Sequence, residues 1–539
     1  MRMLRPLLCV LLTPVLLPAQ GSPSLADKVD RVIGPLATTT APGCAVGVAQ
    51  NGEQVQRAFG MAELEHNVAN TPTTIFESGS MAKQFTAASI VLLALDGKLS
   101  LDEPARKYLP ELPDYGAPLT VRHLLTHTGG VRDWTPVMAL AGLSRGERMI
   151  TQAFALDVTL RQHALDFPPG SEYSYSNSGY TLLATIIERV SGQSLDTFTA
   201  ERLFKPLGMG DTRWRTDYTR LVPHRAQAYA RDGKGWKLDM PFMNVVGNGG
   251  LLTSVGDLLK WNAMLDGRTL GRALVDSMER PMTLTSGKTI EYALGLHVSP
   301  YRGLRTVSHS GVTAGYHTNI ERVLDRRLSI AIMCNAAFAN PVRLTTQLID
   351  AILSPLPAPP VPDTIAMPPA DLQKRAGTYR DLLTHLPLQV SADGGGLSVQ
   401  GAPLHPLRDG GFLAGEGPVR WEFEMTGDAS ATARRITPNG DSRFVRTTLW
   451  SPSAAELGAL AGDWHSDDAE GSFTLKVENG KLAMYRRIGG RSELRPLYRD
   501  TFAAPQFQGV IWSTHEAAGG LMLHVGTGRM RDMPFVKVQ

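Results

Sequence analysis

The sequence predicts an α+β domain of layered design, followed by a proline-rich linker and two small antiparallel β-barrels. Apolar, strand-like runs near residues 44–60 and 328–333 bracket a long region with helical spacing, so one sheet would form from both ends of the first domain. Residues 354–369 contain seven prolines, which cannot continue a helix or pair as a central strand. The chain beyond this linker repeats itself at an offset of 85 to 91 residues.

The first segment of the chain has the pattern of an export signal. Arg2 and Arg5 precede an apolar run from Leu7 to Leu17, and Ala19 is a small residue at a plausible cleavage point. Residues 1–19 are therefore predicted to be a signal peptide, which would make the mature chain secreted or periplasmic. An uncleaved anchor is the alternative. No later stretch has about 18 consecutive apolar residues, so no stable membrane span is expected.

Residues 20–353 are expected to form the first domain. Asn51-Gly52 is a hairpin-turn dipeptide between two strand-like runs, and the two strongest helical runs are each followed by a glycine suited to a helix C-cap. The expected elements, in order, are strands at 44–50 and 54–60, helices at 80–95 and 180–190, and a strand at 328–333.

Residues 370–450 and 451–539 are expected to form one barrel each. Both copies contain short alternating strands separated by Gly, Asp and Asn. The Ala-Gly-Thr-Tyr of residues 376–379 returns as Ala-Gly-Asp-Trp at 461–464, and the Phe-Val-Arg of 444–446 returns as Phe-Val-Lys at 535–537. Two closed barrels of similar size are the simplest architecture for such a repeat.

Composition and cysteine content exclude several classes of function. The 539 residues include 54 basic and 51 acidic side chains, a net charge of +3, which gives no footprint for nucleic acid. Three cysteines and the lack of a His-Glu-x-x-His motif give no reason to expect a metal or another cofactor. Cys44 begins one strand-like run, and Cys334 is the last residue of another. Export permits a disulfide between them, but two separate buried thiols are slightly favoured.

Ser80-Met81-Ala82-Lys83 is the one Ser-x-x-Lys motif in the chain and lies at the start of a predicted helix. Spacing of three places both side chains on one helix face, so the Lys83 amine can contact the Ser80 hydroxyl. A hydroxyl becomes a good nucleophile only when a base takes its proton, and an adjacent amine can do this. A surface serine and lysine are the alternative for the motif taken alone.

Two further motifs follow in chain order. Tyr175-Ser176-Asn177 lies between a turn and the second predicted helix; a tyrosine near a lysine can act as a base, and an asparagine can hold a substrate carbonyl or amide. His309-Ser310-Gly311 lies on an expected edge-like strand, where glycine lets a substrate backbone approach closely. A helix-capping asparagine and an ordinary glycine-rich strand are the simpler interpretations of each motif alone.

Taken together and in this order, the three motifs resemble the active-site boxes of penicillin-recognising serine enzymes, the serine β-lactamase-related and penicillin-binding-protein-like family. The resemblance extends over about residues 30–355. Other segments that look like this family are 119–130, 167–177, 205–209 and 249–257.

This resemblance implies a β-lactamase/transpeptidase-like antiparallel sheet with helices, and acyl transfer that needs no cofactor. By this resemblance, Ser80 is the nucleophile, and either Lys83 or Tyr175, or both, act as the base. Asn177 would orient the substrate, and the backbone N–H groups of Ser80 and Val312 would hold the oxyanion. The His309-Ser310-Gly311 strand would lie beside them, with His309 in place of a family lysine as the donor to a substrate carboxylate or carbonyl.

The group that looks most similar contains class C β-lactamases, D-Ala-D-Ala carboxypeptidases, family-VIII esterases and D-aminopeptidases. The D-aminopeptidases also carry two barrels after the catalytic domain, and these barrels are lipocalin-like. His309 in place of lysine and the barrels both argue against efficient β-lactam hydrolysis.

We therefore expect an exported serine hydrolase that cleaves esters or small-peptide amides. The alternatives are a penicillin-interactive enzyme (a β-lactamase or a D-Ala-D-Ala carboxypeptidase) and a non-catalytic binding or sensor protein. Expected partners are a small molecule or short peptide, and cell-envelope material.

Two further residues are candidates for a role at the site. Ser144 lies in a Gly-x-Ser-x-Gly motif, but the run before it has no strand pattern, so it is a weak rival for the nucleophile. By resemblance to the D-aminopeptidases, a barrel loop could reach the cleft, and Asp500 is the candidate; a solvated turn aspartate is the alternative.

Overall fold

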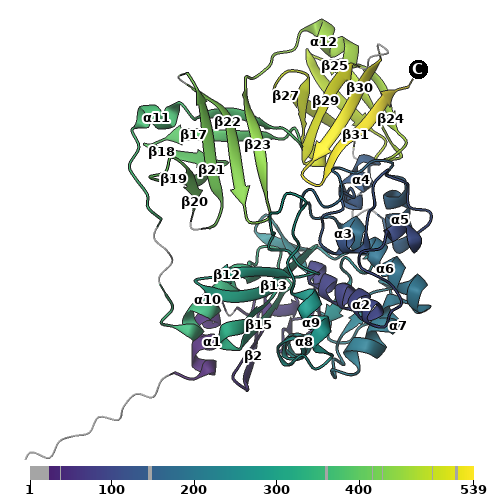
Figure 1. The fold of residues 1–539 in the computed structure, drawn as a ribbon, viewed down its shortest axis with the longest axis vertical. Coiled ribbons are helices and arrows are strands. Elements are labelled where there is room, and N and C mark those ends of the chain that lie inside the picture. Colours follow the sequence, from purple (N-terminus) through teal and green to yellow (C-terminus); the bar gives the residue numbers. More distant parts are fainter. Residues whose placement is uncertain are drawn as a thin grey trace, which may run out of the picture.

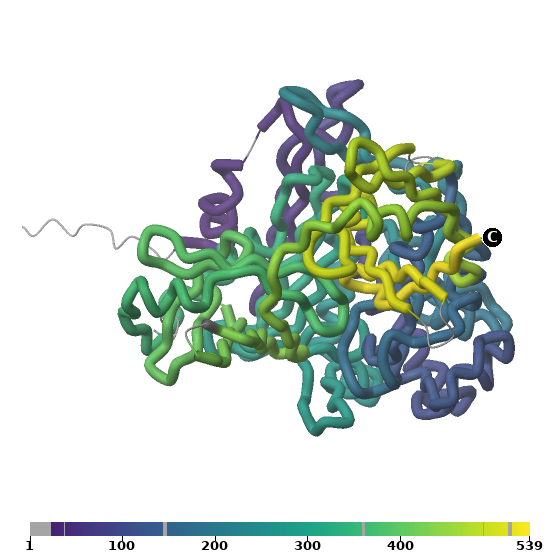
Figure 2. Tube along the Cα trace, turned by 90° about the horizontal axis from the view of Figure 1, so that it is seen from above, coloured from purple at the N-terminus to yellow at the C-terminus, as the bar shows by residue number. Residues whose placement is uncertain are grey.

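The computed structural model describes residues 23–36, 38–143, 148–357, 362–415, 417–427, 429–488, 490–515 and 520–538. They form an α+β domain with two β-barrels above it (Figure 1). Seen from above, the two barrels lie side by side across one end of this first domain (Figure 2). Residues 1–19 and Ser144 fall outside the described residues. In the described part of the chain, no helix combines the length and the apolar character that crossing a membrane requires.

A six-stranded antiparallel sheet forms the centre of the first domain, in the order β12-β13-β14-β15-β1-β2. Strands from the two ends of the domain pair in its middle, where β1 contacts β15. This confirms the prediction of one sheet built from both ends. The strands are β1 (Cys44–Gln50), β2 (Glu53–Phe59), β12 (His297–Tyr301), β13 (Leu304–Thr313), β14 (Tyr316–Val323) and β15 (Leu328–Cys334).

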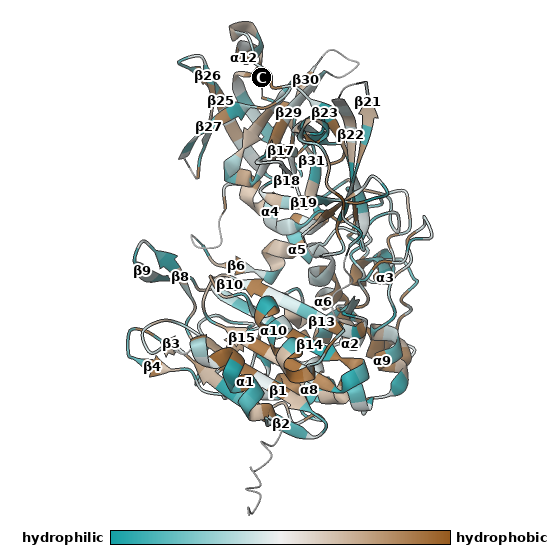
Figure 3. Cartoon of the chain, turned by 90° about the vertical axis from the view of Figure 1, so that its left-hand side faces the viewer, coloured by the Kyte–Doolittle hydropathy of each residue, from teal (hydrophilic) through white to brown (hydrophobic). Residues whose placement is uncertain are grey.

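Helices cover both faces of the sheet. On one face, α1 and α10 pack their apolar sides against β1 and β15. On the other face lies a larger cluster centred on α2, which is buried on nearly all sides (Figures 1 and 3). The helices of the domain are α1 (Leu25–Ile33), α2 (Lys83–Leu95), α3 (Val121–Leu125), α4 (Trp134–Leu140), α5 (Gln152–Leu160), α6 (Asn177–Ser191), α7 (Leu195–Thr199), α8 (Val255–Gly267), α9 (Arg272–Met278) and α10 (Pro341–Leu353).

Local signals agree with the predicted elements at most boundaries. Asn51 and Gly52 both have positive φ, as a tight hairpin turn between β1 and β2 requires. Gly192 ends α6 in the left-handed conformation expected of a C-cap glycine. The helix predicted from residue 80 begins as a 3₁₀ turn, η2 (Gly79–Ala82), and becomes α-helical at Lys83.

Short strands complete the first domain. They pair in two-stranded or three-stranded sheets that are separate from the central sheet. These are β3 (Met61–Glu63), β4 (Val68–Ala69), β5 (Phe76–Glu77), β6 (Ile150–Thr151), β7 (Arg213–Trp214), β8 (Tyr229–Asp232), β9 (Gly235–Leu238), β10 (Met243–Asn244) and β11 (Leu251–Thr253).

Cys44 and Cys334 form a disulfide, so the favoured interpretation of two separate thiols is wrong. The two residues are direct partners in the antiparallel register of β1 and β15, with their Cα atoms 4.0 Å apart. Directly opposed residues in such a pair come close enough for their side chains to bond. The alternating pattern of each run alone does not reveal this register.

Both C-terminal units are closed antiparallel barrels, as predicted, and each has eight strands. A short helix precedes each, α11 (Pro369–Gln373) and α12 (Ala454–Leu460). The first barrel comprises β16 (Gly377–Asp381), β17 (Pro387–Asp393), β18 (Gly396–Val399), β19 (Ala402–Pro406), β20 (Phe412–Ala414), β21 (Arg420–Thr426), β22 (Ala429–Thr437) and β23 (Gly440–Thr447). The second comprises β24 (Gly462–Ser466), β25 (Gly471–Glu478), β26 (Lys481–Arg486), β27 (Gly490–Pro496), β28 (Thr501–Ala504), β29 (Gly509–His515), β30 (Leu521–Thr527) and β31 (Met530–Lys537).

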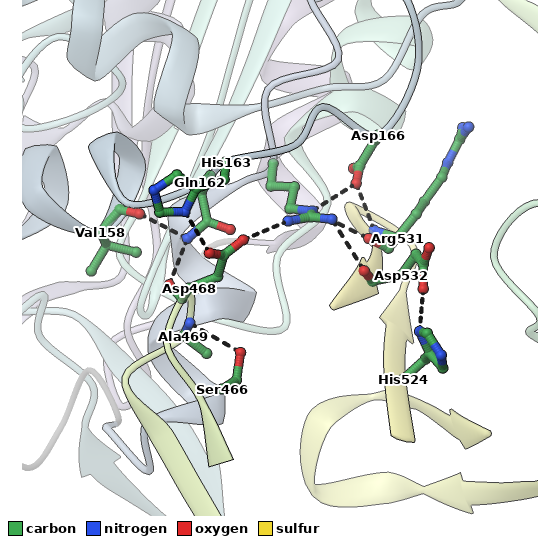
Figure 4. A network of polar contacts seen from close by, with 11 residues as sticks. Val158, Gln162, His163, Asp166, Ser466, Asp468, Ala469, His524, Arg531 and Asp532 are labelled. Atoms are coloured by element: carbon green, nitrogen blue, oxygen red, sulfur yellow. Dashed lines mark hydrogen bonds and ion pairs between the residues drawn. The ribbon is translucent and has the colours of Figure 1, made fainter. Parts of the chain in front are cut away.

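Arg132 joins the second barrel to the first domain. Its side chain is 4% exposed and forms ion pairs of 3.3 Å with Asp166 of its own domain and Asp468 of the barrel. It also donates hydrogen bonds to the backbone carbonyls of Arg531 and Asp532. Figure 4 shows Asp468 on one side of this network and Arg531 with Asp532 on the other. One guanidinium therefore holds two separate parts of the barrel against the domain.

The first barrel is held from two sides. Lys288 of the first domain forms an ion pair of 2.8 Å with Asp441. The second barrel contributes Trp512, which stacks on His385 with ring centroids 4.2 Å apart, and Tyr498, whose hydroxyl donates to the His385 carbonyl. The three units therefore contact one another pairwise.

Replacing Arg132 by methionine should lower the free energy of unfolding by about 3–5 kcal/mol, because it leaves buried carboxylates without their cation. Burial already raises the pKa of Asp166 to about 6, and Arg132 opposes this rise. Urea unfolding of Arg132→Met beside Arg122→Met tests this, since Arg122 pairs with Asp102 at an exposed site and its loss should cost under about 1 kcal/mol. Equal stability of the two variants would contradict this role of Arg132.

Candidate active site

All eight residues predicted for the site meet at one cleft of the first domain. The cleft is a cavity of about 390 Å³ between η2, the loop before α6, the segment at 248–250 and the end of β13. Lys83 lies beneath it, in contact with Ser80. The other seven line it directly: Ser80, Tyr175, Asn177, His309, Ser310, Gly311 and Val312.

Lys83 is fully buried, and three oxygen atoms surround its amine. Nζ lies 3.3 Å from Ser80 Oγ, 3.0 Å from Asn177 Oδ1 and 2.6 Å from the backbone carbonyl of Asn248. Two of these oxygens belong to carbonyl groups and can only accept hydrogen bonds. The Ser80 hydroxyl alone can also donate.

The environment of Lys83 favours the neutral amine. Burial lowers the pKa of Lys83 well below its usual value, the nearby charge of Asp133 opposes this, and Arg529 lowers the pKa further. A neutral amine has two N–H donors and one lone pair. The donors match the carbonyl oxygens of Asn177 and Asn248, which leaves the lone pair for the Ser80 O–H.

Asn177 is held in one orientation at the start of α6. Its Oδ1 accepts from Lys83, and its Nδ2 donates to Asp133 Oδ2 at 2.9 Å. The Asp133 carboxylate is completely buried, and its other oxygen accepts from the backbone N–H and hydroxyl of Thr135. Asp133 therefore fixes the amide of Asn177 and supplies negative charge near Lys83.

Tyr175 forms the wall beside the lysine. Its ring centroid lies 4.7 Å from Lys83 Nζ, close enough for a cation–π contact when the amine is protonated. Burial raises the pKa of the Tyr175 hydroxyl, and interaction with Ser80 opposes the rise. The contact with Ser80 is too loose to count as a hydrogen bond, so Tyr175 Oη has no full partner among the described residues. The hydroxyl therefore keeps its proton at neutral pH and faces the nucleophile.

A chain of hydrogen bonds runs behind the cleft. Burial lowers the pKa of both His127 and His309 well below the usual value, so both rings are neutral. The Ser176 N–H donates to His127 Nδ1, which places the His127 proton on Nε2, facing Tyr292 Oη at 3.1 Å. The Tyr292 hydroxyl can then donate to His309 Nε2 at 3.1 Å, and His309 Nδ1 donates to the Ser310 carbonyl at 2.6 Å. Each proton in this assignment has one acceptor.

This chain of hydrogen bonds changes the expected role of His309. Both of its ring nitrogens are engaged within the protein, so His309 offers no free N–H to a carboxylate or carbonyl of the substrate in this state. Its ring instead packs among His297, Tyr292 and Tyr175. His309 is therefore better described as a residue that positions the strand at the cleft.

Two glycines bring the backbones of η2 and β13 together. A Cβ on Gly79 would lie 2.7 Å from the Val312 nitrogen, and a Cβ on Gly311 would lie 2.0 Å from the Ser78 carbonyl oxygen. Gly79 also has φ of 55°, which side chains disfavour. The pairing of β12 with β13 ends at Ser308, so residues 309–313 leave one strand edge open beside Ser80.

Several residues at the site were not identified from the sequence. Asp133, Asn248 and Tyr292 have no local motif. His127 also has none, and its ring contacts those of both Tyr175 and Tyr292. Asp500 is not among the described residues that line the cleft. A different loop of the same barrel reaches it instead and places Arg529 in the wall.

Within the ranges that the structure describes, no group of three or more His, Cys, Asp or Glu side chains could hold a metal ion.

Comparison with known proteins gives consistent results. The β-lactamase family matches residues 29–353, more than half of the chain. A D-aminopeptidase of Brucella melitensis biotype 2 is 27% identical over 476 residues, which cover 85% of this chain and 86% of that protein. The octameric penicillin-binding protein homologue from Pyrococcus abyssi has a TM-score of 0.54 at 22% identity, covering 87% and 98%. The D-amino acid amidase from Ochrobactrum anthropi SV3 has a TM-score of 0.53 at 23% identity, covering 61% and 98%. At these identities, the two structures show the fold alone.

Hydrolysis should need neutral Lys83, so kcat/KM for a p-nitrophenyl ester should be lost as pH falls through the lowered Lys83 pKa. Asp133→Asn removes a charge that raises this pKa, and the acidic limb should therefore move to lower pH while kcat falls. The matched control is Asp325→Asn, which removes an equal charge at an exposed pair with Arg305. A limb that stays in place or moves to higher pH in Asp133→Asn would contradict this account.

Proposed function

The chain belongs to the β-lactamase family of serine hydrolases, and we propose that it cleaves amide bonds in short peptides or amides of D-amino acids. The observation that carries the proposal is the set of contacts around Lys83, which leaves its lone pair to the Ser80 hydroxyl. The choice of D-configured substrates is supported by the D-aminopeptidase, whose alignment covers 85% of this chain and therefore extends beyond the first domain.

In the proposed reaction, Ser80 is the nucleophile and Lys83 is the base. Lys83 takes the hydroxyl proton as Ser80 Oγ attacks the substrate carbonyl carbon. The resulting ammonium is stabilised by the Tyr175 and Tyr180 rings, at 4.7 and 5.4 Å, and by the charge of Asp133. The backbone N–H groups of Ser80 and Val312, brought together by Gly79, receive the oxyanion.

Release of the leaving group needs a proton on its nitrogen. Tyr175 keeps its proton because its pKa is raised, and its unpaired hydroxyl faces Ser80. We assign Tyr175 as the donor of a proton to the leaving nitrogen. The proton that Lys83 took from Ser80 then passes to Tyr175 and restores its hydroxyl. Lys83 then deprotonates a water molecule as it attacks the acyl-Ser80 ester, and this proton returns to Ser80 Oγ when the ester bond breaks, which regenerates the enzyme. Asn177 orients the scissile amide, and no metal takes part in these steps.

We also propose that the protein acts outside the cytoplasm. The signal-like pattern of residues 1–19 and the Cys44–Cys334 disulfide both support this, since disulfides persist mainly in oxidising compartments. N-terminal sequencing of the natively produced protein should begin near residue 20. A cytoplasmic protein that retains Met1 would contradict the proposal.

Hydrolysis of D-amino-acid p-nitroanilides tests the proposed function. We expect kcat/KM for the D-alanine and D-phenylalanine compounds to exceed that of their L-enantiomers by at least about tenfold. Ser80→Ala should lower kcat by about 10⁴-fold or more, because the acyl-enzyme cannot form. Ser277→Ala, on α9 and outside the residues that line the cleft, should keep wild-type rates. Equal rates for both enantiomers, or full activity of Ser80→Ala, would refute the proposal.

A further inference from the structure

The turn between β30 and β31 carries Arg529 from the second barrel into the cleft. The Asp133 N–H donates a hydrogen bond of 3.1 Å to the Arg529 carbonyl, so the backbone of the turn is attached to the first domain. This bond does not involve the arginine side chain. A substitution at Arg529 therefore leaves the backbone attachment of the turn in place.

The Arg529 guanidinium is available to a ligand. Its side chain is 52% exposed, and the guanidinium lies 4.9 Å from the centroid of the Tyr175 ring. The nearest carboxylate is Asp133, with Nη1 and Oδ2 3.7 Å apart, which is too far for a hydrogen bond. Asp133 already accepts hydrogen bonds at both oxygens, from Asn177 and Thr135. The Asp133 carboxylate thus balances part of the Arg529 charge, while the N–H donors of the guanidinium stay available for a ligand.

Of the two charged residues among the described residues that line the cleft, Arg529 is the less fully neutralised, because its ion pair with Asp133 is 3.7 Å long. The other charged residue in this set is Glu77, which is buried and paired with both Arg215 and Arg225. Burial lowers the pKa of His297 to about 4 and that of His309 further below its usual value, so both are neutral at pH 7. The cleft therefore offers an anionic group of a ligand a cationic partner in Arg529.

Arg529 also stands at one end of the cleft. Together with Tyr175 it lines a second cavity, of about 620 Å³, which lies between the first domain and both barrels. The walls of this second cavity carry both signs of charge, from Lys288, Arg435 and Arg531 and from Glu172, Asp381 and Asp441. A short substrate bound at Ser80 and extending toward the barrels would reach the guanidinium at the junction of the two cavities.

We propose that Arg529 binds a carboxylate of the substrate, so that the preferred substrates are short anionic D-amino-acid peptides or amides. The planar guanidinium can make two parallel hydrogen bonds to one carboxylate, which a lysine cannot reproduce. The inference rests on the proposed function and specifies its substrate. Arg529 of the second barrel would therefore bind the substrate carboxylate, which is the role that the sequence predicted for His309.

Two matched pairs of substrates test this proposal, because the carboxylate can belong to the acyl part or to the leaving group. The first pair is N-succinyl-D-alanine p-nitroanilide and its succinamide; the second is D-Ala-D-Ala and its C-terminal amide. Rates are measured on the pH plateau, since Arg529 also lowers the pKa of Lys83. The variants are Arg529→Gln, Arg529→Lys and the control Arg499→Gln, which removes the same charge from an exposed turn of the same barrel.

In at least one pair, the wild type should prefer the acid over the amide by about 10- to 100-fold in kcat/KM, mainly through KM. Arg529→Gln should reduce the preference to within about twofold, because kcat/KM for the acid falls more than kcat/KM for the amide. Arg529→Lys should be intermediate, and Arg499→Gln should match the wild type. No preference in the wild type, or an undiminished preference in Arg529→Gln, overturns the proposal.

A second readout separates this inference from the proposed function. If the wild type hydrolyses none of the four compounds, the proposed function fails, but calorimetric binding of N-succinyl-D-alanine and of its succinamide still tests Arg529. Tighter binding of the acid that disappears in Arg529→Gln supports the carboxylate site. Equal binding of the two compounds to the wild type rejects it.

Discussion

Burial of the Lys83 amine is the constraint on which the site depends. An amine without access to water favours its neutral form, and two carbonyl oxygens that can only accept hydrogen bonds occupy its donors. The remaining lone pair faces Ser80. The surrounding structure maintains this arrangement, since Asp133 holds Asn177 in position and α2, buried on nearly all sides, holds the lysine beneath the cleft.

The barrels take part in the same arrangement. The Arg132 network fixes the second barrel against the first domain through charged side chains with little exposure (Figure 4). The turn that carries Arg529 lies next to this network in sequence, because Arg531 and Asp532 supply two of the carbonyls that Arg132 binds. A firm interface near the cleft can therefore place a cation in it with a defined position, which a loosely tethered domain could not do.

The parts of the fold that follow local rules could be predicted from the sequence. The Asn51-Gly52 hairpin, the C-cap at Gly192 and the two repeated barrels need only turn chemistry and periodicity. The motif containing Ser80 and Lys83 was visible because one helical turn carries both residues.

The remaining features depend on contacts between distant segments. The Cys44–Cys334 disulfide requires the register of two strands separated by 290 residues. The neutral state of His309 follows mainly from burial, which no motif signals. Arg529 comes from another domain altogether, and the candidate chosen in its place, Asp500, lies on a different turn of the same barrel.

The most direct test of the central claim is to locate the site of covalent modification by a fluorophosphonate probe. Peptide mapping by mass spectrometry of the labelled wild-type protein should place a single adduct on Ser80, and Ser80→Ala should remain unmodified. Lys83→Met should also escape labelling, because the hydroxyl would have no base. An adduct on another serine, such as Ser144, or rapid labelling of Lys83→Met would contradict the account.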